Sequence, residues 1–140
     1  MSEILTDELL TGIVAIDEQH RNLFVRAGTI VDAMRRTHAT RDVRRLLDFL
    51  DSYCAEHFQT EEDAMERFHV PDVLKHRTAH KVYLGRVQAL CEELDAKGAN
   101  ADLAVRARMT LVDLFAEHIK EHDLPMSRHL RERVDGDFGL

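Results

Sequence analysis

The sequence contains no tryptophan, and its 140 residues include only two prolines, six glycines and two cysteines. Cys54 and Cys91 show no CxxC spacing, so the sequence predicts two buried thiols rather than a disulfide framework or a zinc knuckle. No apolar run reaches the length of a bilayer, and the start MSEILTDELLTGI lacks the basic region and apolar core of a signal peptide. We therefore expect a cytoplasmic protein that does not bind a membrane.

Basic residues are also fewer than acidic ones. The 19 lysines and arginines stand against 26 aspartates and glutamates, which gives a formal net charge of -7. This balance argues against nucleic acid as a partner, because binding to phosphates depends on positive charge. Histidine, by contrast, is abundant, with nine residues. Since histidine is the commonest metal-ligand side chain, this excess is the first indication of function.

Apolar residues recur every three or four positions through most of the chain, which predicts long helices, and no stretch alternates as a strand would. Four stretches follow this pattern: residues 17–36, 40–67, 71–97 and 100–123. The residues expected to begin or end them are Asp17, Thr40, Pro71, Gly98, and either Asn100 or Asp102.

Helices of similar length joined by short loops pack antiparallel around one apolar core. The predicted fold is all-α, an up-down-up-down antiparallel four-helix bundle. We expect a single domain over residues 1–140, with an N-terminal arm (1–16), the bundle (17–123) and a short C-terminal tail or helix (124–140).

Polar residues interrupt the apolar stripes of all four helices. The histidines expected to face the core are His20, His57, His76, His80 and His118. A single buried histidine is most simply explained by a hydrogen bond to a neighbour. Five imidazoles directed at one bundle axis could not all find protein acceptors, whereas a metal site satisfies their nitrogens together. Glu61 lies one helical turn after His57, so it shares the same face.

A second carboxylate is expected from the stretch EHIKEHDLP. Asp123 follows His118 by five residues, which places it off the face of a regular helix by about 140°. Pro125 cannot donate a backbone hydrogen bond to Glu121, so the helix must loosen or end around residues 121–124 and can then deliver Asp123 to the core. His122, at a regular four-residue spacing, is the rival candidate. Imidazoles with two carboxylates and no thiolate suit iron, manganese or zinc.

Taken together, these segments resemble the hemerythrin family, specifically the single-domain bacterial hemerythrins. The matching segments are LLTGIVAIDEQH, HFQTEEDAM, the stretch from Pro71 to HRTAH, and HIKEHD. The resemblance implies a four-helix bundle whose oxo- or hydroxo-bridged centre of two iron ions binds O₂ reversibly. It implies that His76, His80 and His118 hold one iron and His20 and His57 the other, with Glu61 and Asp123 bridging both.

The implied O₂ pocket is walled by Phe58, Leu114, Phe115 and Ile119. The chain departs from the family here, since members commonly carry tryptophan where this sequence has Leu5 and Leu114. Leucine in place of an indole ring leaves more space in the pocket unless a neighbour fills it.

The sequence leaves two functions open, ligand binding and catalysis. An O₂-binding protein for storage, delivery or sensing is preferred, and the alternative is a di-iron enzyme with peroxidase-like, oxidase-like or nitric-oxide-related activity. No positioned general acid or base and no substrate motif is recognisable, so no catalytic residue is predicted. Other polar residues are expected at or near the surface: Glu62, Asp63, His38, His69, His122 and His129.

Overall fold

The computed structural model describes residues 5–36 and 40–133, and within these ranges all regular structure is helical. The segments are η1 (Asp7–Leu9, a 3₁₀ turn), α1 (Val14–Arg35), α2 (Thr40–Arg67), α3 (Val73–Lys97), α4 (Ala101–Arg108), η2 (Met109–Asp113), α5 (Leu114–His118), η3 (Ile119–Asp123) and α6 (Leu124–Arg133). Both η2 and η3 are π-helical.

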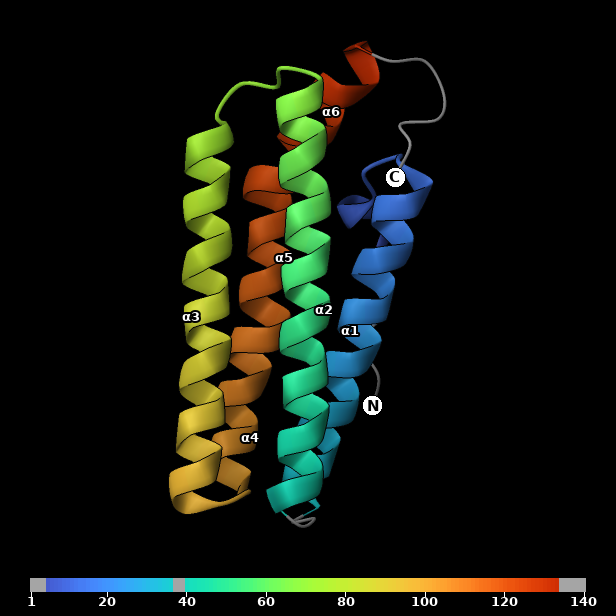
Figure 1. The fold of residues 1–140 in the computed structure, drawn as a ribbon. Helices are drawn as coiled ribbons and strands as arrows, with labels where there is room; N and C mark the ends of the chain where they lie inside the picture. The colour runs from blue at the N-terminus through green and yellow to red at the C-terminus, as the bar shows by residue number, and fades with distance from the viewer. Residues whose placement is uncertain (1–4, 37–39, 134–140) are drawn as a thin grey trace.

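Four helical columns lie side by side (Figure 1). The first three are α1, α2 and α3. The fourth is continuous from α4 through η2, α5 and η3 to α6, without an intervening loop. The structure therefore confirms an all-helical bundle. It also shows that residues 124–133 extend the fourth column as a helix, whereas the rest of the expected tail lies outside the described residues.

The first helix begins earlier than predicted. Its first residue is Val14, and Asp17 lies within its first turn rather than at its N-cap, so that prediction was wrong. The Asp17 carboxylate instead accepts hydrogen bonds from the backbone N–H and the hydroxyl of Thr11, both at 2.8 Å, and from the N–H of Gly12 at 3.3 Å. Gly12 has a φ of +82°, a conformation that glycine adopts without strain. Asp17 thus fixes the turn that leads into the helix.

The boundaries of the later helices follow the sequence more closely. Thr40 is the first helical residue of α2. Pro71 lies in the turn before α3 rather than in its first turn, and α3 ends at Lys97, with Gly98 as its C-cap at a φ of +78°. At the start of α4, the Asn100 side chain accepts a 2.8 Å hydrogen bond from the backbone of Leu103, so Asn100 and not Asp102 is the cap.

The apolar core is divided into two clusters. The larger one draws on all four columns, and the smaller one joins the start of α1, the end of α2 and α6. Along α1, His20 lies between Ile16 of the smaller cluster and Leu23 of the larger one. Along the last column, Asp123 lies likewise between Ile119 and Met126. A polar layer therefore separates two apolar regions of one bundle.

The apolar residues that recur at helical spacing are mostly buried, although Leu46 of α2 is 39% exposed. Cys54 and Cys91 are both buried and unpaired, as expected. Leu5, at a position where the family commonly has tryptophan, joins the larger cluster.

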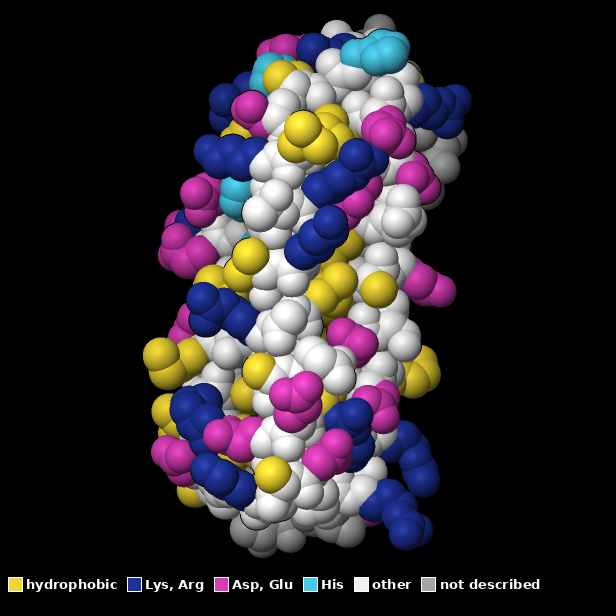
Figure 2. All heavy atoms as spheres, turned by 60° about the vertical axis from the view of Figure 1, so that its left-hand side comes forward, with side chains coloured by type: hydrophobic (Ala, Val, Ile, Leu, Met, Phe, Trp, Pro, Cys, Tyr) yellow, Lys and Arg dark blue, Asp and Glu magenta, His cyan; other side chains and the backbone are white. Residues whose placement is uncertain are grey.

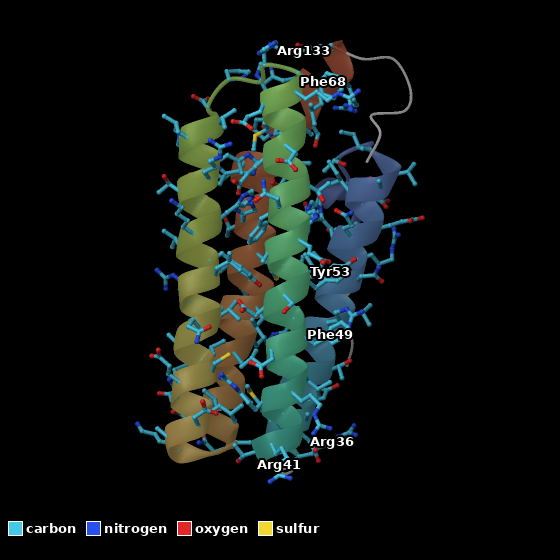
Figure 3. All side chains as sticks on the ribbon, in the orientation of Figure 1. Arg36, Arg41, Phe49, Tyr53, Phe68 and Arg133 are labelled. Atoms are coloured by element: carbon cyan, nitrogen blue, oxygen red, sulfur yellow. The ribbon has the colours of Figure 1, made fainter. Side chains whose placement is uncertain are left out.

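The surface carries both signs of charge. Figure 2 shows acidic and basic side chains interspersed along one face, with scattered apolar side chains between them. Phe49 and Tyr53 are labelled along α2 in Figure 3. The central carbon of the Arg26 guanidinium, from α1, lies 4.6 and 5.1 Å from their ring centroids. None of the helices in the described ranges combines the length and the apolar character needed to cross a membrane.

Candidate metal centre

Seven buried polar side chains meet in the layer between the two apolar clusters. They are the seven metal-site residues expected from the sequence, and none is more than 6% exposed: His20, His57, Glu61, His76, His80, His118 and Asp123. Residues that are 103 positions apart in the chain thus share one small volume, because every helical column contributes at this level.

Glu61 occupies the middle of this group, and its two carboxylate oxygens face different histidines. One oxygen, Oε1, lies 3.1 Å from Nε2 of His80 and 3.5 Å from Nε2 of His76. The other, Oε2, lies 3.1 Å from Nε2 of His57 and 3.5 Å from Nε2 of His20. Glu61 therefore connects histidines of α3 on one side with histidines of α1 and α2 on the other.

Asp123 repeats this arrangement from the opposite column. Its Oδ1 lies 2.8 Å from Nε2 of His76 and 3.2 Å from Nε2 of His118. Its Oδ2 lies 3.1 Å from Nε2 of His20. Each of the two carboxylates thus directs one oxygen to each half of the layer, as a ligand bridging two neighbouring cations would.

The π-helical segment η3 brings Asp123 to this position. Leu124 donates its backbone N–H to the carbonyl of Ile119, a step of five residues that a regular α-helix does not make. The predicted widened turn is thus confirmed, although it begins at Ile119 and the helix continues past Pro125 instead of ending. This wider turn compensates for the five-residue spacing between His118 and Asp123.

His122, the rival candidate, lies at the edge of the layer. Its side chain is 14% exposed, and its ring centroid is 5.2 Å from that of His118 and 5.4 Å from that of His76. It belongs to neither group of converging donor atoms found among the described residues. The π-turn therefore favours Asp123. The other π-helical segment, η2, was not predicted, and we find no sequence signal for it.

Two outer partners of the histidines were missed by the sequence analysis. Nδ1 of His57 lies 2.5 Å from the side-chain oxygen of Gln19 on α1. Nδ1 of His80 lies 2.7 Å from Oε2 of Glu62, which the sequence analysis had placed in solvent. Glu62 is only 16% exposed, because it turns toward α3 rather than outward. Contacts across helices of this kind leave no periodic signal in a sequence.

Apolar rings enclose part of the layer. Phe58 stacks on His80 with ring centroids 4.0 Å apart and an interplanar angle of 9°. The ring of Phe115 meets that of His20 edge-on at 5.4 Å, and Ile119 is fully buried. Leu114 differs from these three, since it is half-buried and lines a surface groove between α3 and the fourth column.

The buried charges of the layer shift one another's pKa values. Burial by itself lowers the pKa of His20 and His76, but the nearby carboxylates of Asp123 and Glu61 outweigh it and raise each pKa to about 9. Burial would raise the pKa of Glu61 and Asp123, yet the surrounding histidines hold both values well below the usual range. Without a metal, protons on the imidazoles therefore balance the two buried carboxylates at neutral pH.

Buried donor atoms without hydrogen bonds show that protons do not satisfy the layer fully. Five such atoms are Nε2 of His20, His57 and His118, Oε2 of Glu61 and Oδ2 of Asp123. Unsatisfied buried polar atoms are costly, and metal ions would satisfy all of them at once. Among the described residues, the donor atoms fall into two sets, within each of which all atoms lie within 4.8 Å of one another. The sets are Glu61, His76, His80, His118 and Asp123, and His20, His57, Glu61 and Asp123. The site therefore fits two cations that share Glu61 and Asp123.

Metal loading is expected to release protons. His20 and His76, with pKa values raised to about 9, carry protons at about pH 7.5, and each must lose its proton before its nitrogen binds a metal. Adding ferrous iron anaerobically to the metal-free protein in weak buffer should release about two protons per chain. A pH-indicator dye measures this release.

The same shifts give the metal-free protein a pH dependence of defined sign. Because the folded-state pKa values lie above the unfolded value of 6.5, their contribution to stability is complete below pH 6.5 and is lost as the pH rises toward 9. Urea unfolding across this range provides the check. Metal uptake without proton release, or stability that rises over this interval, would contradict the assignment.

Comparison with known proteins gives a consistent result. The family model described as "Hemerythrin HHE cation binding domain" matches residues 11–128. A protein named bacteriohemerythrin from Ralstonia nicotianae is 28% identical over 130 residues, covering 91% of this chain and 88% of that protein. Proteins of the same name from Stenotrophomonas maltophilia and Clostridium acetobutylicum are 27% and 25% identical, covering 84% and 87% of this chain and 74% and 93% of their own lengths.

Proposed function

The chain belongs to the hemerythrin family, and on this premise we propose that it holds two iron ions and binds O₂ reversibly. The observation that carries the proposal is the placement of the two carboxylates, each of which directs one oxygen to either half of a histidine layer. The proposal includes the up-down-up-down antiparallel order expected of the four-helix bundle.

The ligand assignment follows the two sets of donor atoms. His76, His80 and His118 would hold one iron, and His20 and His57 the other. Glu61 and Asp123 would bridge both ions. The first iron would thus have three imidazoles and the second two, so the second would have fewer protein donors and would be the one to accept an exogenous ligand.

When bound, the di-iron centre would supply the electrons and the coordination position that reversible O₂ binding needs. The protein's part is to fix the ligands and to limit the entry of water. Phe58, Phe115 and Ile119 serve the second purpose, because they are almost completely buried and their apolar surfaces lie against or beside the histidine layer. Leu114 would act from the outer side of this wall, where it lines the groove beside α3.

We propose O₂ storage, delivery or sensing rather than turnover of a substrate. All seven titratable groups of the layer are assigned as ligands, which leaves none of these free to act as a general acid or base. The enzymatic alternative has no specific observation in its favour. The expected cytoplasmic location and the single-domain organisation stay predictions.

The proposal is tested by loading the protein with ferrous iron under anaerobic conditions, counting the iron, and exposing it to O₂. We expect about two irons per chain and a visible absorption spectrum that appears with O₂ and disappears when O₂ is removed under vacuum. Immediate and irreversible oxidation with sustained consumption of peroxide would support the enzymatic alternative. Clearly fewer than two irons per chain would overturn the site assignment.

A further inference from the structure

We propose that Glu62 is a positioning residue that, with Arg77 as its counter-charge, sets the relative affinity of one metal position for ferric and ferrous iron through His80. This inference rests on the proposed function, because it concerns the iron that His76, His80 and His118 would hold. Neither residue belongs to the groups of converging donor atoms.

The contacts place Glu62 directly behind a proposed ligand. His80 donates its Nδ1–H to Oε2 of Glu62 over 2.7 Å, which leaves Nε2 free to face the metal layer. The stacked ring of Phe58 restricts the same imidazole from the side. Glu62 thereby fixes both the tautomer and the direction of the ligand nitrogen.

Arg77 holds the other oxygen of this carboxylate. Its Nε donates to Oε1 of Glu62 over 3.2 Å, while its Nη2 lies 2.9 Å from Oε1 of Glu66. Arg77 is 32% exposed and Glu66 is 61% exposed, so the chain of contacts runs from the buried histidine outward to the surface. The negative charge of Glu62 is therefore shared between an imidazole and a guanidinium.

In the other half of the layer, Nδ1 of His57 lies against Gln19, whose side-chain amide is neutral. A carboxylate that accepts the Nδ1–H makes an imidazole a stronger electron donor than an amide does. We therefore expect the metal position that His80 faces to favour ferric iron more strongly than the metal position that His57 faces.

Removing the charge of Glu62 and removing the charge of Arg77 should shift the reduction potential in opposite directions. A general loss of structure would not produce shifts of opposite sign. Glu62→Gln keeps an oxygen that accepts from His80 but removes the negative charge, so ferric iron should lose its advantage and the reduction potential should rise. Arg77→Gln removes the counter-charge, so the carboxylate should act more strongly on His80 and the potential should fall. A tenfold change in the ratio of ferric to ferrous affinity corresponds to about 59 mV for one electron.

The experiment is a spectroelectrochemical titration of the iron-loaded wild type and the two variants. The controls are Asp63→Asn and Lys81→Gln, which remove an exposed charge of each sign next to Glu62 and His80 in the sequence. We expect the reduction potential to rise for Glu62→Gln and to fall for Arg77→Gln. Each shift should correspond to a threefold to about tenfold change in the ratio of ferric to ferrous affinity. In the controls this ratio should change by less than about twofold.

Unchanged potentials, shifts of the same sign in both variants, or control shifts as large as those of the variants would overturn the inference. If Glu62→Gln fails to retain iron, the sign of the shift in Arg77→Gln decides alone. Failure of the proposed function is recognised separately in the wild type, as a low iron count or as irreversible reaction with O₂, and does not depend on the variants.

Discussion

Replacement of Glu61 by alanine is expected to reduce metal binding from about two ions per chain to fewer than one. The side chain is fully buried, and its two oxygens lie within 3.5 Å of histidine nitrogens from both halves of the site. Its removal takes one donor from each ion at the same time. The loss of affinity should therefore exceed the roughly 100-fold that removal of an outer partner of a ligand can cost.

Metal analysis after anaerobic loading and desalting measures this effect. The matched control is Glu56→Ala, the same substitution on an exposed position of the same helix, which should leave the metal content unchanged. Circular dichroism of both variants without metal shows whether the bundle still forms. A folded Glu61→Ala protein that retains two tightly held ions would contradict the bridging role.

Replacement of Phe115 by alanine is expected to lower the free energy of unfolding of the metal-free protein by about 3–5 kcal/mol. The ring is 1% exposed and packs against Phe24 and Tyr83, with centroid distances of 5.3 and 5.5 Å, as well as against His20. The bundle cannot fill the resulting cavity without moving residues of α1 and α3. The cavity would also lie beside the polar layer and open it to water.

Urea unfolding followed by circular dichroism gives the difference in free energy. Phe49→Ala is the control, because Phe49 is 58% exposed and its ring lies against the guanidinium of Arg26. Phe49→Ala should lower the free energy of unfolding by less than about 1 kcal/mol. Similar losses in the two variants would show that Phe115 does not have the packing role described above.

The helices were predictable because their signal is local. Apolar residues at intervals of three and four identified all four columns, and Gly98 and Asn100 marked ends through the backbone chemistry of a single turn. The wrong prediction at the start of α1 also concerns a single residue. Asp17 has the composition of an N-cap, but in the structure its carboxylate binds the Thr11–Gly12 turn. The sequence offers the acceptor without stating which donors will reach it.

In the candidate site, too, features within one helix were predictable and contacts between helices were not. The inward positions of His57, Glu61, His76 and His80 follow from four-residue spacing. The widened turn at Asp123 was inferred from Pro125, and the structure shows it. The partners Gln19 and Glu62 could not be inferred, because each contact joins two different helices and depends on their relative rotation and height.

The sequence by itself determined an all-helical chain, the helical faces that carry histidine and carboxylate, and a chemistry suited to metal. Periodicity and residue type suffice for these, since both act within one helix. Only the tertiary structure decided that Asp123 rather than His122 joins the layer, that each carboxylate faces both halves of it, and that Glu62 lies behind His80. These features depend on distances between columns, which packing of the whole core sets and no single helix encodes.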